Sequence, residues 1–183
     1  FVGTMKGLEA QKVPQEGFEL RTISVMGFPR RLSPELFKAS FLAAKACTES
    51  RRIIKDFRPD VVVGTGGYVC GPVILTAALA GIPCVIQEQN TIPGVTNRVL
   101  ARFARKVAVA FQDSVKFFPD PKRVVVTGNP VRPEIATIPK ADGLKAFKLS
   151  PFRKTLLVFG GGQGAMSVNR ALVRALPALL KKG

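Results

Sequence analysis

The chain of 183 residues contains no histidine and no tryptophan, and Tyr68 is its single tyrosine. Without histidine, the chain can form neither a catalytic triad with an imidazole nor a metal site with histidine ligands. Few aromatic rings are available for stacking on bases, although phenylalanine is common. These absences exclude several frequent kinds of enzyme site and disfavour a base-stacking surface.

Cysteine is also scarce, and Cys47, Cys70 and Cys84 are scattered without a C-x-x-C pair. This spacing indicates neither a disulfide framework nor a zinc site with thiolate ligands, and it fits a reducing cytosol. Acidic residues are few as well, with 12 Asp and Glu against 28 Lys and Arg, which gives a formal charge of +16. Such a charge favours anionic partners, namely nucleic acid, phospholipid head groups or phosphorylated small molecules, without choosing among them.

No charged residue occurs from Val61 to Gln87, a length that could span a membrane. Glycine and proline residues nevertheless divide this stretch into pieces that are each too short to cross a bilayer. We predict that it forms a strand, a loop, a buried helix, a second loop and a second strand.

Short apolar runs alternate with helical stretches along the whole chain, a pattern that predicts an α/β fold with a Rossmann-like, doubly wound parallel sheet. The predicted strands are Val61–Val63, Cys84–Ile86, Val107–Ala110, Val124–Val126 and Leu156–Phe159. The predicted helices are Pro34–Phe57, Pro72–Leu79, Gly94–Ala104 and Ala165–Leu180. A proline-rich stretch between Gly128 and Lys154, with a short helix near Asp142–Leu149, predicts a boundary between residues 1–130 and residues 131–183.

Glycines follow two of the predicted strands, at Gly64-Thr65-Gly66-Gly67 and at Gly160–Gly164. Ligands of open α/β sheets bind beyond the carboxyl ends of the strands, where glycine lets backbone amides and a helix amino terminus approach an anion. For the first loop, a tight turn with close helix packing is an equally good interpretation. The second loop lacks the Gly-Lys-Ser/Thr of a P-loop, and we favour a diphosphate site over a structural turn.

Polar residues follow the strand that begins at Cys84, and strand alternation would direct Gln87 and Gln89 to one side and Glu88 and Asn90 to the other. A carboxylate and an amide at this position can bind sugar hydroxyl groups or orient a substrate. The alternative is that Glu88 pairs with an arginine such as Arg98. Similarly, Arg132 could hold a phosphate or could be a solvated linker residue.

The predicted helix Pro34–Phe57 interleaves apolar and basic residues. An apolar stripe with basic flanks can lie on an anionic bilayer, but a stripe facing the core with a solvated basic face is the more frequent arrangement. The candidate membrane contacts are Leu36, Phe37, Lys38, Phe41, Leu42 and Lys45.

Four motifs stand together in order: "VVVGTGGYVCGP", "GIPCVIQEQNTIPGVTNRVLARFA", "VTGNPVRPEI" and "VFGGGQGAMSVN". With them the chain, over essentially its whole length, resembles the MurG family of bacterial peptidoglycan N-acetylglucosaminyltransferases. The resemblance implies a GT-B fold with two Rossmann-like domains. It implies inverting transfer of N-acetylglucosamine from the UDP-sugar to lipid I, giving lipid II, without a cofactor or a tightly bound metal. It also implies a peripheral location on the cytoplasmic face of the bacterial plasma membrane, an anionic membrane surface as partner, and no specific nucleic acid.

The resemblance also implies roles for individual residues. Those matched to the acceptor diphosphate are Gly64, Thr65, Gly66, Gly67 and Tyr68. Those matched to the donor are Asn90, Arg132, Gly161, Gly162, Gln163 and Gly164. Glu88 is the candidate catalytic base within the chain, although the family's main base is expected outside it. The chain departs from the family pattern at Gln87, where many members have histidine, and at Gly162, where many have serine.

The family's first strand and glycine loop, with its histidine, are expected before Phe1, and the uridine-binding half is expected after Gly183. We therefore expect residues 1–130 to face the acceptor and the membrane, and residues 131–183 to begin the donor domain. The chain alone is expected to be inactive. The alternatives are a related GT-B glycosyltransferase that makes glycolipids on diacylglycerol, a non-catalytic module that binds anionic membranes, and a nucleic-acid-binding protein.

Overall fold

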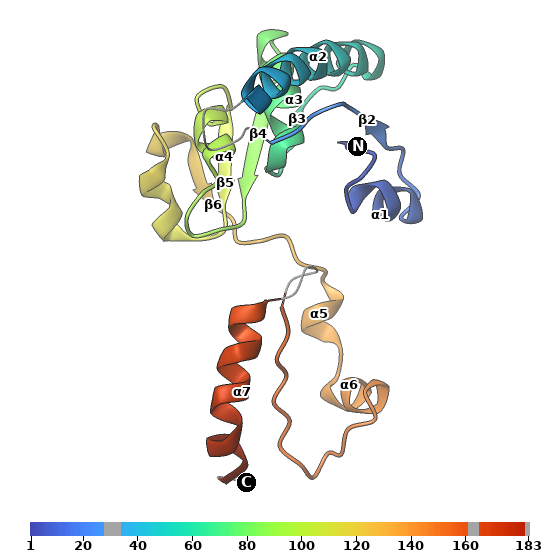
Figure 1. Ribbon diagram of the computed structural model, residues 1–183, viewed down its shortest axis with the longest axis vertical. Coiled ribbons are helices and arrows are strands. Elements are labelled where there is room, and N and C mark those ends of the chain that lie inside the picture. The colour runs from blue at the N-terminus through green and yellow to red at the C-terminus, as the bar shows by residue number, and fades with distance from the viewer. Residues whose placement is uncertain (28–33, 161–164, 182–183) are drawn as a thin grey trace. The chain divides into compact units, whose positions relative to one another are not determined.

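The computed structural model describes the chain apart from residues 28–33, 161–164 and 182–183, together with the side chains of residues 34–38. The chain divides into two compact units, Phe1–Pro130 and Val131–Gly183. This division lies at the boundary that the sequence places after residue 130. Figure 1 shows the elements of both units.

The first unit contains two parallel sheets. In the smaller sheet, β1 (Val2–Gly3) pairs with β2 (Arg21–Thr22). The larger sheet has the order β3-β4-β5-β6, with strands Val62–Gly64, Cys84–Glu88, Lys106–Val109 and Val124–Val126. All of the pairs are parallel, which confirms the predicted α/β class and the four predicted strands of this unit within one or two residues.

The helices of the first unit are α1 (Glu9–Gln15), α2 (Pro34–Phe57), α3 (Gly67–Leu79) and α4 (Val95–Leu100), with 3-10 turns at Gln112–Phe117 and Pro121–Arg123. The prediction that the uncharged stretch after Val61 is divided into strand, helix and strand is confirmed by β3, α3 and β4. Helix α3 begins at Gly67, although its start was predicted at Pro72. Proline removes one backbone hydrogen bond from a helix, and burial of Cys70, Val73 and Ile74 on either side of it outweighs that local cost.

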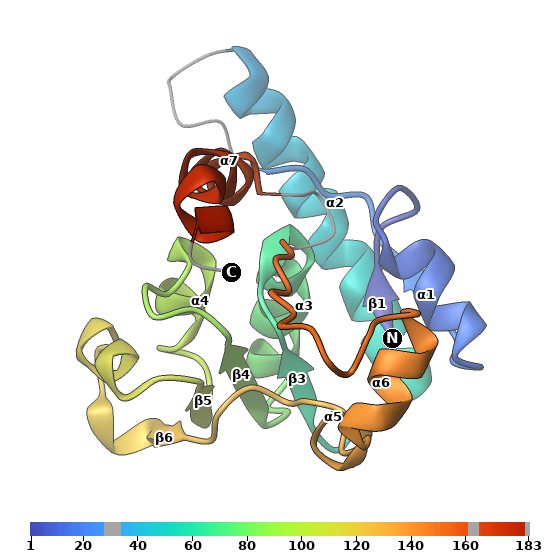
Figure 2. The ribbon, with the colours of Figure 1, turned by 90° about the horizontal axis from the view of Figure 1, so that it is seen from below.

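The core of this unit lies between the larger sheet and α3, which also contacts α2 and α4 (Figure 2). Alternate residues of β4 are buried, so Cys84, Ile86 and Glu88 lie on the side of the sheet that faces the core. The carboxylate of Glu88 therefore continues a row of apolar side chains. The three cysteines are free, and burial raises the pKa of the Cys70 and Cys84 thiols.

The second unit contains helices α5 (Glu134–Thr137), α6 (Lys140–Ala146) and α7 (Met166–Lys181). The two helices predicted near Asp142–Leu149 and Ala165–Leu180 are thus present with shifted ends. The predicted strand Leu156–Phe159 is wrong, because these residues are irregular and Leu157 is 73% exposed. A strand is held by hydrogen bonds to a neighbouring strand. The described residues of this unit form no other strand with which Leu156–Phe159 could pair.

Candidate active site

The candidate site lies where β3 and β4 end. These strands are parallel neighbours, and Gly64 is in register with Ile86. Their carboxyl ends therefore meet at one edge of the sheet, which is where open α/β sheets bind ligands. The loop 64–67 leaves β3 at this edge, and the turn 88–94 leaves β4 beside it.

Glycine is required at different positions of the loop for different structural reasons. A Cβ atom at Gly64 would lie 2.4 Å from Cys70 Sγ and 2.9 Å from Ile74 Cγ1, so this glycine permits close packing of α3 on β3. Gly66 has φ 96° and ψ −169°, a conformation that is essentially restricted to glycine, and Gly67 has φ 77°. Close helix packing is therefore sufficient to explain Gly64, whereas the positive φ angles of Gly66 and Gly67 set the backbone conformation of the loop.

The amino terminus of α3 opens directly from this loop. Gly66 is the N-cap residue, no side chain caps the helix, and its first turn carries no acidic residue. The first backbone N–H groups of a helix have no partner within it and carry a partial positive charge. Thr65 and Tyr68 are both exposed beside them. This end of α3 is suited to an anion, as the resemblance implies for the acceptor diphosphate.

Glu88 is 1% exposed and accepts four hydrogen bonds. Its Oε1 accepts from the backbone N–H and the side-chain Nδ2 of Asn90, each at 2.9 Å. Its Oε2 accepts from the N–H of Gly94 at 3.1 Å and from Asn97 Nδ2 at 2.9 Å. The partners of Glu88 are thus amides, and not Arg98, which the sequence offered as an alternative partner.

Burial raises the pKa of Glu88, but the hydrogen bonds from Asn90, Asn97 and Gly94 lower it by more, so the pKa lies below its ordinary value. The carboxylate therefore stays ionised near neutral pH. A general base needs an oxygen within reach of the proton that it removes, and both oxygens of Glu88 are already occupied by donors. This geometry favours a positioning role for Glu88 over the predicted role as a base.

Asn97 connects the turn to the glycine loop. It is 3% exposed, its Nδ2 donates to Glu88, and a Cβ atom added at Gly66 would lie 3.3 Å from the same Nδ2. Its Oδ1 is buried without a hydrogen-bond partner among the described residues. Asn97 is not among the site residues predicted from the sequence. A signal was present, because Asn97 precedes Leu100, Ala101 and Ala104 at helical spacing on the buried side of this segment.

On the other side of the sheet, Gln87 and Gln89 lie together, which confirms the predicted alternation. Gln89 Nε2 donates to Gln87 Oε1 and, at 3.1 Å, to the carbonyl oxygen of Thr65. Gln87 Nε2 donates to Asn129 Oδ1 at 3.3 Å, and Asn129 Nδ2 donates to the carbonyl oxygen of Gln89 at 3.4 Å. These contacts join the loop after β3, the end of β4 and the turn after β6.

The structure thus brings together only part of the predicted site. Asn90 is exposed and adjoins Glu88, and its carbonyl oxygen accepts from Ser114 Oγ at 3.0 Å. Arg132 is exposed in the second unit. The predicted donor residues Gly161, Gly162, Gln163 and Gly164 lie outside the described residues.

Residues 1–109, more than half of the chain, match the family described as "Glycosyltransferase family 28 N-terminal domain". The chain belongs to glycosyltransferase family 28. It is 50% identical over 176 residues to a protein of Thermoanaerobacter sp. (strain X514), with 96% of this chain and 48% of that protein covered. That protein is named "UDP-N-acetylglucosamine--N-acetylmuramyl-(pentapeptide) pyrophosphoryl-undecaprenol N-acetylglucosamine transferase". A protein of the same name from Lactiplantibacillus plantarum is 47% identical, with 100% of this chain and 50% of that protein covered.

Among solved structures, the crystal structure of Acinetobacter baumannii MurG matches with a TM-score of 0.58 and 35% identity, covering 72% of this chain and 36% of that one. A UDP-GlcNAc 2-epimerase from Neisseria meningitidis also reaches a TM-score of 0.58, over 94% of this chain and 53% of that one, but at 16% identity it shows the fold alone. These matches confirm the resemblance found in the sequence. The chain spans about half the length of the curated relatives that it matches.

We expect Glu88→Gln to lower the free energy of unfolding at pH 7 by about 1–3 kcal/mol, because the new NH₂ group would face a donor that Glu88 now satisfies. The folded pKa of Glu88 lies below its ordinary value of 4.5, so the stabilisation is present above that value and is lost as the pH falls through the folded pKa. Urea denaturation from pH 7 to pH 3 measures the free energy of unfolding of the unchanged chain and of Glu88→Gln. The difference between these two free energies is expected to become smaller only at the acidic end of the range.

The matched control for this experiment is Glu16→Gln, which changes an exposed carboxylate. Its effect on unfolding is expected to stay within about 0.5 kcal/mol. Equal stability of Glu88→Gln and the unchanged chain at pH 7 would contradict the role given to Glu88.

Proposed function

We propose that the full-length protein transfers N-acetylglucosamine from UDP-N-acetylglucosamine to lipid I, with inversion, and so forms lipid II for peptidoglycan synthesis. The observation that carries this proposal is the contact between the two loops at the strand ends, 64–67 and 88–94, through the hydrogen bond from Gln89 to Thr65. The chain that contains them is 50% identical over 176 residues to a transferase named for these substrates. The donor is a UDP-sugar and the acceptor is an undecaprenyl-linked pyrophosphate, so both substrates carry diphosphates. The high positive charge of the chain suits both of them.

The loop 64–67 and Tyr68 are proposed to receive the acceptor diphosphate. The uncapped amino terminus of α3 supplies backbone N–H donors and the positive end of the helix dipole. Glu88 and Asn97 support this loop from the core side, and Gln89 supports it from the other side. Rigid donors of this kind stabilise developing charge without reorganising during the reaction.

The donor is proposed to contact Asn90, Arg132 and the loop Gly161–Gly164. Departure of UDP places negative charge on a diphosphate, which an arginine can hold through two parallel hydrogen bonds. We propose no tightly bound metal, because the resemblance implies electrostatic stabilisation by backbone and arginine groups. The described residues include no group of three or more His, Cys, Asp or Glu side chains that could hold a metal ion.

A transfer assay with the full-length protein tests the proposed activity. Radiolabelled UDP-N-acetylglucosamine is supplied with lipid I or with diacylglycerol, and labelled lipid is separated by chromatography. We expect label on lipid I, no label on diacylglycerol and no turnover by residues 1–183 alone. Transfer to diacylglycerol but not to lipid I would instead establish the glycolipid glycosyltransferase, and binding without turnover by the full-length protein would favour a non-catalytic module.

Gly66→Ala in the full-length protein tests the glycine loop. A Cβ atom at φ 96° introduces strain of about 1–3 kcal/mol or forces the loop to move. We expect kcat/KM for lipid I to fall about tenfold or more, with the KM for the UDP-sugar unchanged. Gly17→Ala is the matched control, because Gly17 also has positive φ but lies after α1, and it should leave both constants unchanged. Full activity of Gly66→Ala would remove the loop from the acceptor site.

We propose that α2 contacts an anionic membrane on the cytoplasmic face. Phe41 is 73% exposed and Leu42 is partly buried. Lys45 is exposed, and its Nζ forms an ion pair with Glu49 Oε1 at 3.6 Å. The opposite face of the helix packs inward through Ala39, Ala46 and Ser50, so an exposed apolar and basic face coexists with a core-facing stripe. The side chains of Leu36, Phe37 and Lys38 lie outside the description. No helix in the described part of the chain has the length and hydropathy that crossing a bilayer requires.

Vesicle flotation tests the membrane contact. We expect the chain to bind vesicles that contain phosphatidylglycerol, and we expect Phe41→Ser to weaken that binding severalfold because an exposed aromatic anchor is lost. Phe152→Ser, at a phenylalanine of the second unit that is 96% exposed, is the control and should bind as the unchanged chain does. Tighter binding to duplex DNA than to these vesicles at equal salt would contradict the membrane proposal.

A further inference from the structure

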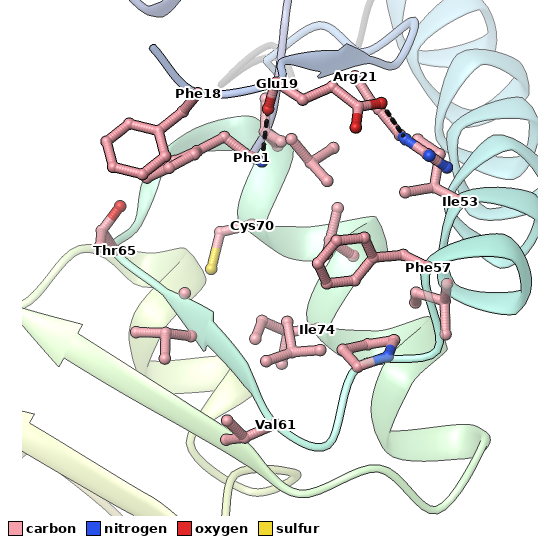
Figure 3. A pocket seen from close by; sticks show the side chains of 18 of the residues that line it. Phe1, Phe18, Glu19, Arg21, Ile53, Phe57, Val61, Thr65, Cys70 and Ile74 are labelled. Carbon is pink, nitrogen blue, oxygen red and sulfur yellow. Dashed lines mark hydrogen bonds and ion pairs between the residues drawn. The ribbon is translucent and has the colours of Figure 1, made fainter. Parts of the chain in front are cut away.

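Tyr68 is the second residue of α3 and follows the loop 64–67 directly. The Cα–Cβ bonds of a helix tilt toward its amino terminus, so the ring leans toward the uncapped N–H groups of α3. Cys70 and Ile74 of the same helix line an apolar pocket together with β3 (Figure 3), and Tyr68 does not line that pocket. Tyr68 is therefore on the outer side of the first turn, where it is 65% exposed.

The exposed ring of Tyr68 nevertheless has a close neighbour, because its tip lies against Gly27. A Cβ atom added at Gly27 would lie 2.5 Å from Cζ of Tyr68, 2.7 Å from Cε1 and 2.9 Å from the hydroxyl oxygen. A side chain at this position would therefore collide with the ring. Gly27 is not among the glycines with positive φ, so the ring, and not the backbone conformation, accounts for glycine here.

Gly27 is itself held in place by the segment that follows β2. Ile23 is 4% exposed and packs in a cluster with side chains of α2 and α3. The N–H of Ser24 donates to Oε2 of Glu49 on α2 at 2.6 Å, and the hydroxyl of Ser24 donates to Oε1 at 3.2 Å. Contacts with two helices therefore fix the path of this segment, which brings Gly27 to Tyr68.

We infer that Gly27 is a positioning residue for Tyr68, and that it sets the place at which the phenol hydroxyl meets the acceptor diphosphate. The inference rests on the proposed function, because that function assigns Tyr68 to the acceptor. A phenol hydroxyl can donate a hydrogen bond to a phosphate oxygen, as the first N–H groups of a helix do. With glycine at position 27, the ring can stay beside the start of α3, where both kinds of donor serve one diphosphate.

A methyl group at position 27 is expected to displace the ring and to leave the fold intact. The atoms that it would meet are at the free end of an exposed side chain, which can turn to another rotamer. The backbone of Gly27, in contrast, belongs to a segment that Ile23 and Ser24 hold against the helices. Gly27→Ala therefore separates the position of the ring from the stability of the protein.

¹⁹F NMR of the full-length protein labelled with 3-fluorotyrosine measures the position of the ring without any substrate. The Tyr68 resonance is assigned by its loss in Tyr68→Phe. We expect Gly27→Ala to move this resonance toward that of free 3-fluorotyrosine, with an unchanged midpoint of urea denaturation. Gly143→Ala is the matched control, because a Cβ atom at Gly143 of α6 would meet no atom within 4 Å, and it should leave the resonance in place.

Transfer kinetics of the full-length protein measure the consequence for the acceptor. We expect Gly27→Ala to lower kcat/KM for lipid I about tenfold, because displacement of a positioned group is costly, and to leave the KM for the UDP-sugar unchanged. In the Tyr68→Ala background no ring remains to be displaced, so Gly27→Ala is expected to cause no further loss. Gly143→Ala should leave both constants unchanged. If Gly27→Ala alone does not fold, the double variant with Tyr68→Ala is expected to fold, because the collision is then removed.

Four results would overturn the inference and leave the proposed function in place. They are an unmoved Tyr68 resonance in Gly27→Ala, full kcat/KM of Gly27→Ala for lipid I, an equal loss from Gly27→Ala with and without the Tyr68 ring, and a double variant that does not fold. Failure of the unchanged protein to use lipid I would instead contradict the proposed function. The role of Gly27 toward the acceptor would then fail with it, even if the resonance moved as expected.

Discussion

The hydrogen bonds that Glu88 accepts from Asn90, Gly94 and Asn97 are the interaction on which the candidate site depends. The side chain continues the row of Cys84 and Ile86 that faces the core, a position where an unpaired carboxylate would be strongly unfavourable. Donors on both oxygens make this burial possible. The same hydrogen bonds hold the backbone in place from the end of β4 to the first turn of α4.

This constraint extends to the glycine loop through Asn97. Its side chain is held by Glu88 and lies against Gly66, while Gln89 holds the carbonyl oxygen of Thr65 from the other side of the sheet. The loop that opens α3 is therefore contacted by Asn97 of α4 and by Gln89 of the turn after β4. A loop fixed in this way can present backbone N–H groups to a diphosphate in one geometry, which is the property that a metal-free transferase site would need.

The parallel sheet could be predicted from the sequence because runs such as Val124–Val126 and Val107–Ala110 are apolar at every position, as strands covered on both faces are. The sides taken by Gln87 and Gln89 followed from alternation alone. The partners of Glu88 could not be predicted, because Arg98, Asn97 and Gly94 are all near in sequence and only the path of the turn selects among them. Local signals also misplaced the start of α3, where burial outweighs Pro72, and the strand at Leu156–Phe159, which lacks a described neighbour.

The most direct measurement of the central claim is the pKa of the Glu88 carboxyl itself. The chain is prepared with ¹³C-labelled glutamate, the Glu88 resonance is assigned by comparison with Glu88→Gln, and its chemical shift is followed during acid titration under folded conditions. We expect a midpoint below the ordinary pKa of 4.5, because the amide donors lower the pKa by more than burial raises it. A midpoint at or above 4.5 would show that the carboxylate is not held by these donors, and the structural basis of the site proposed here would be contradicted.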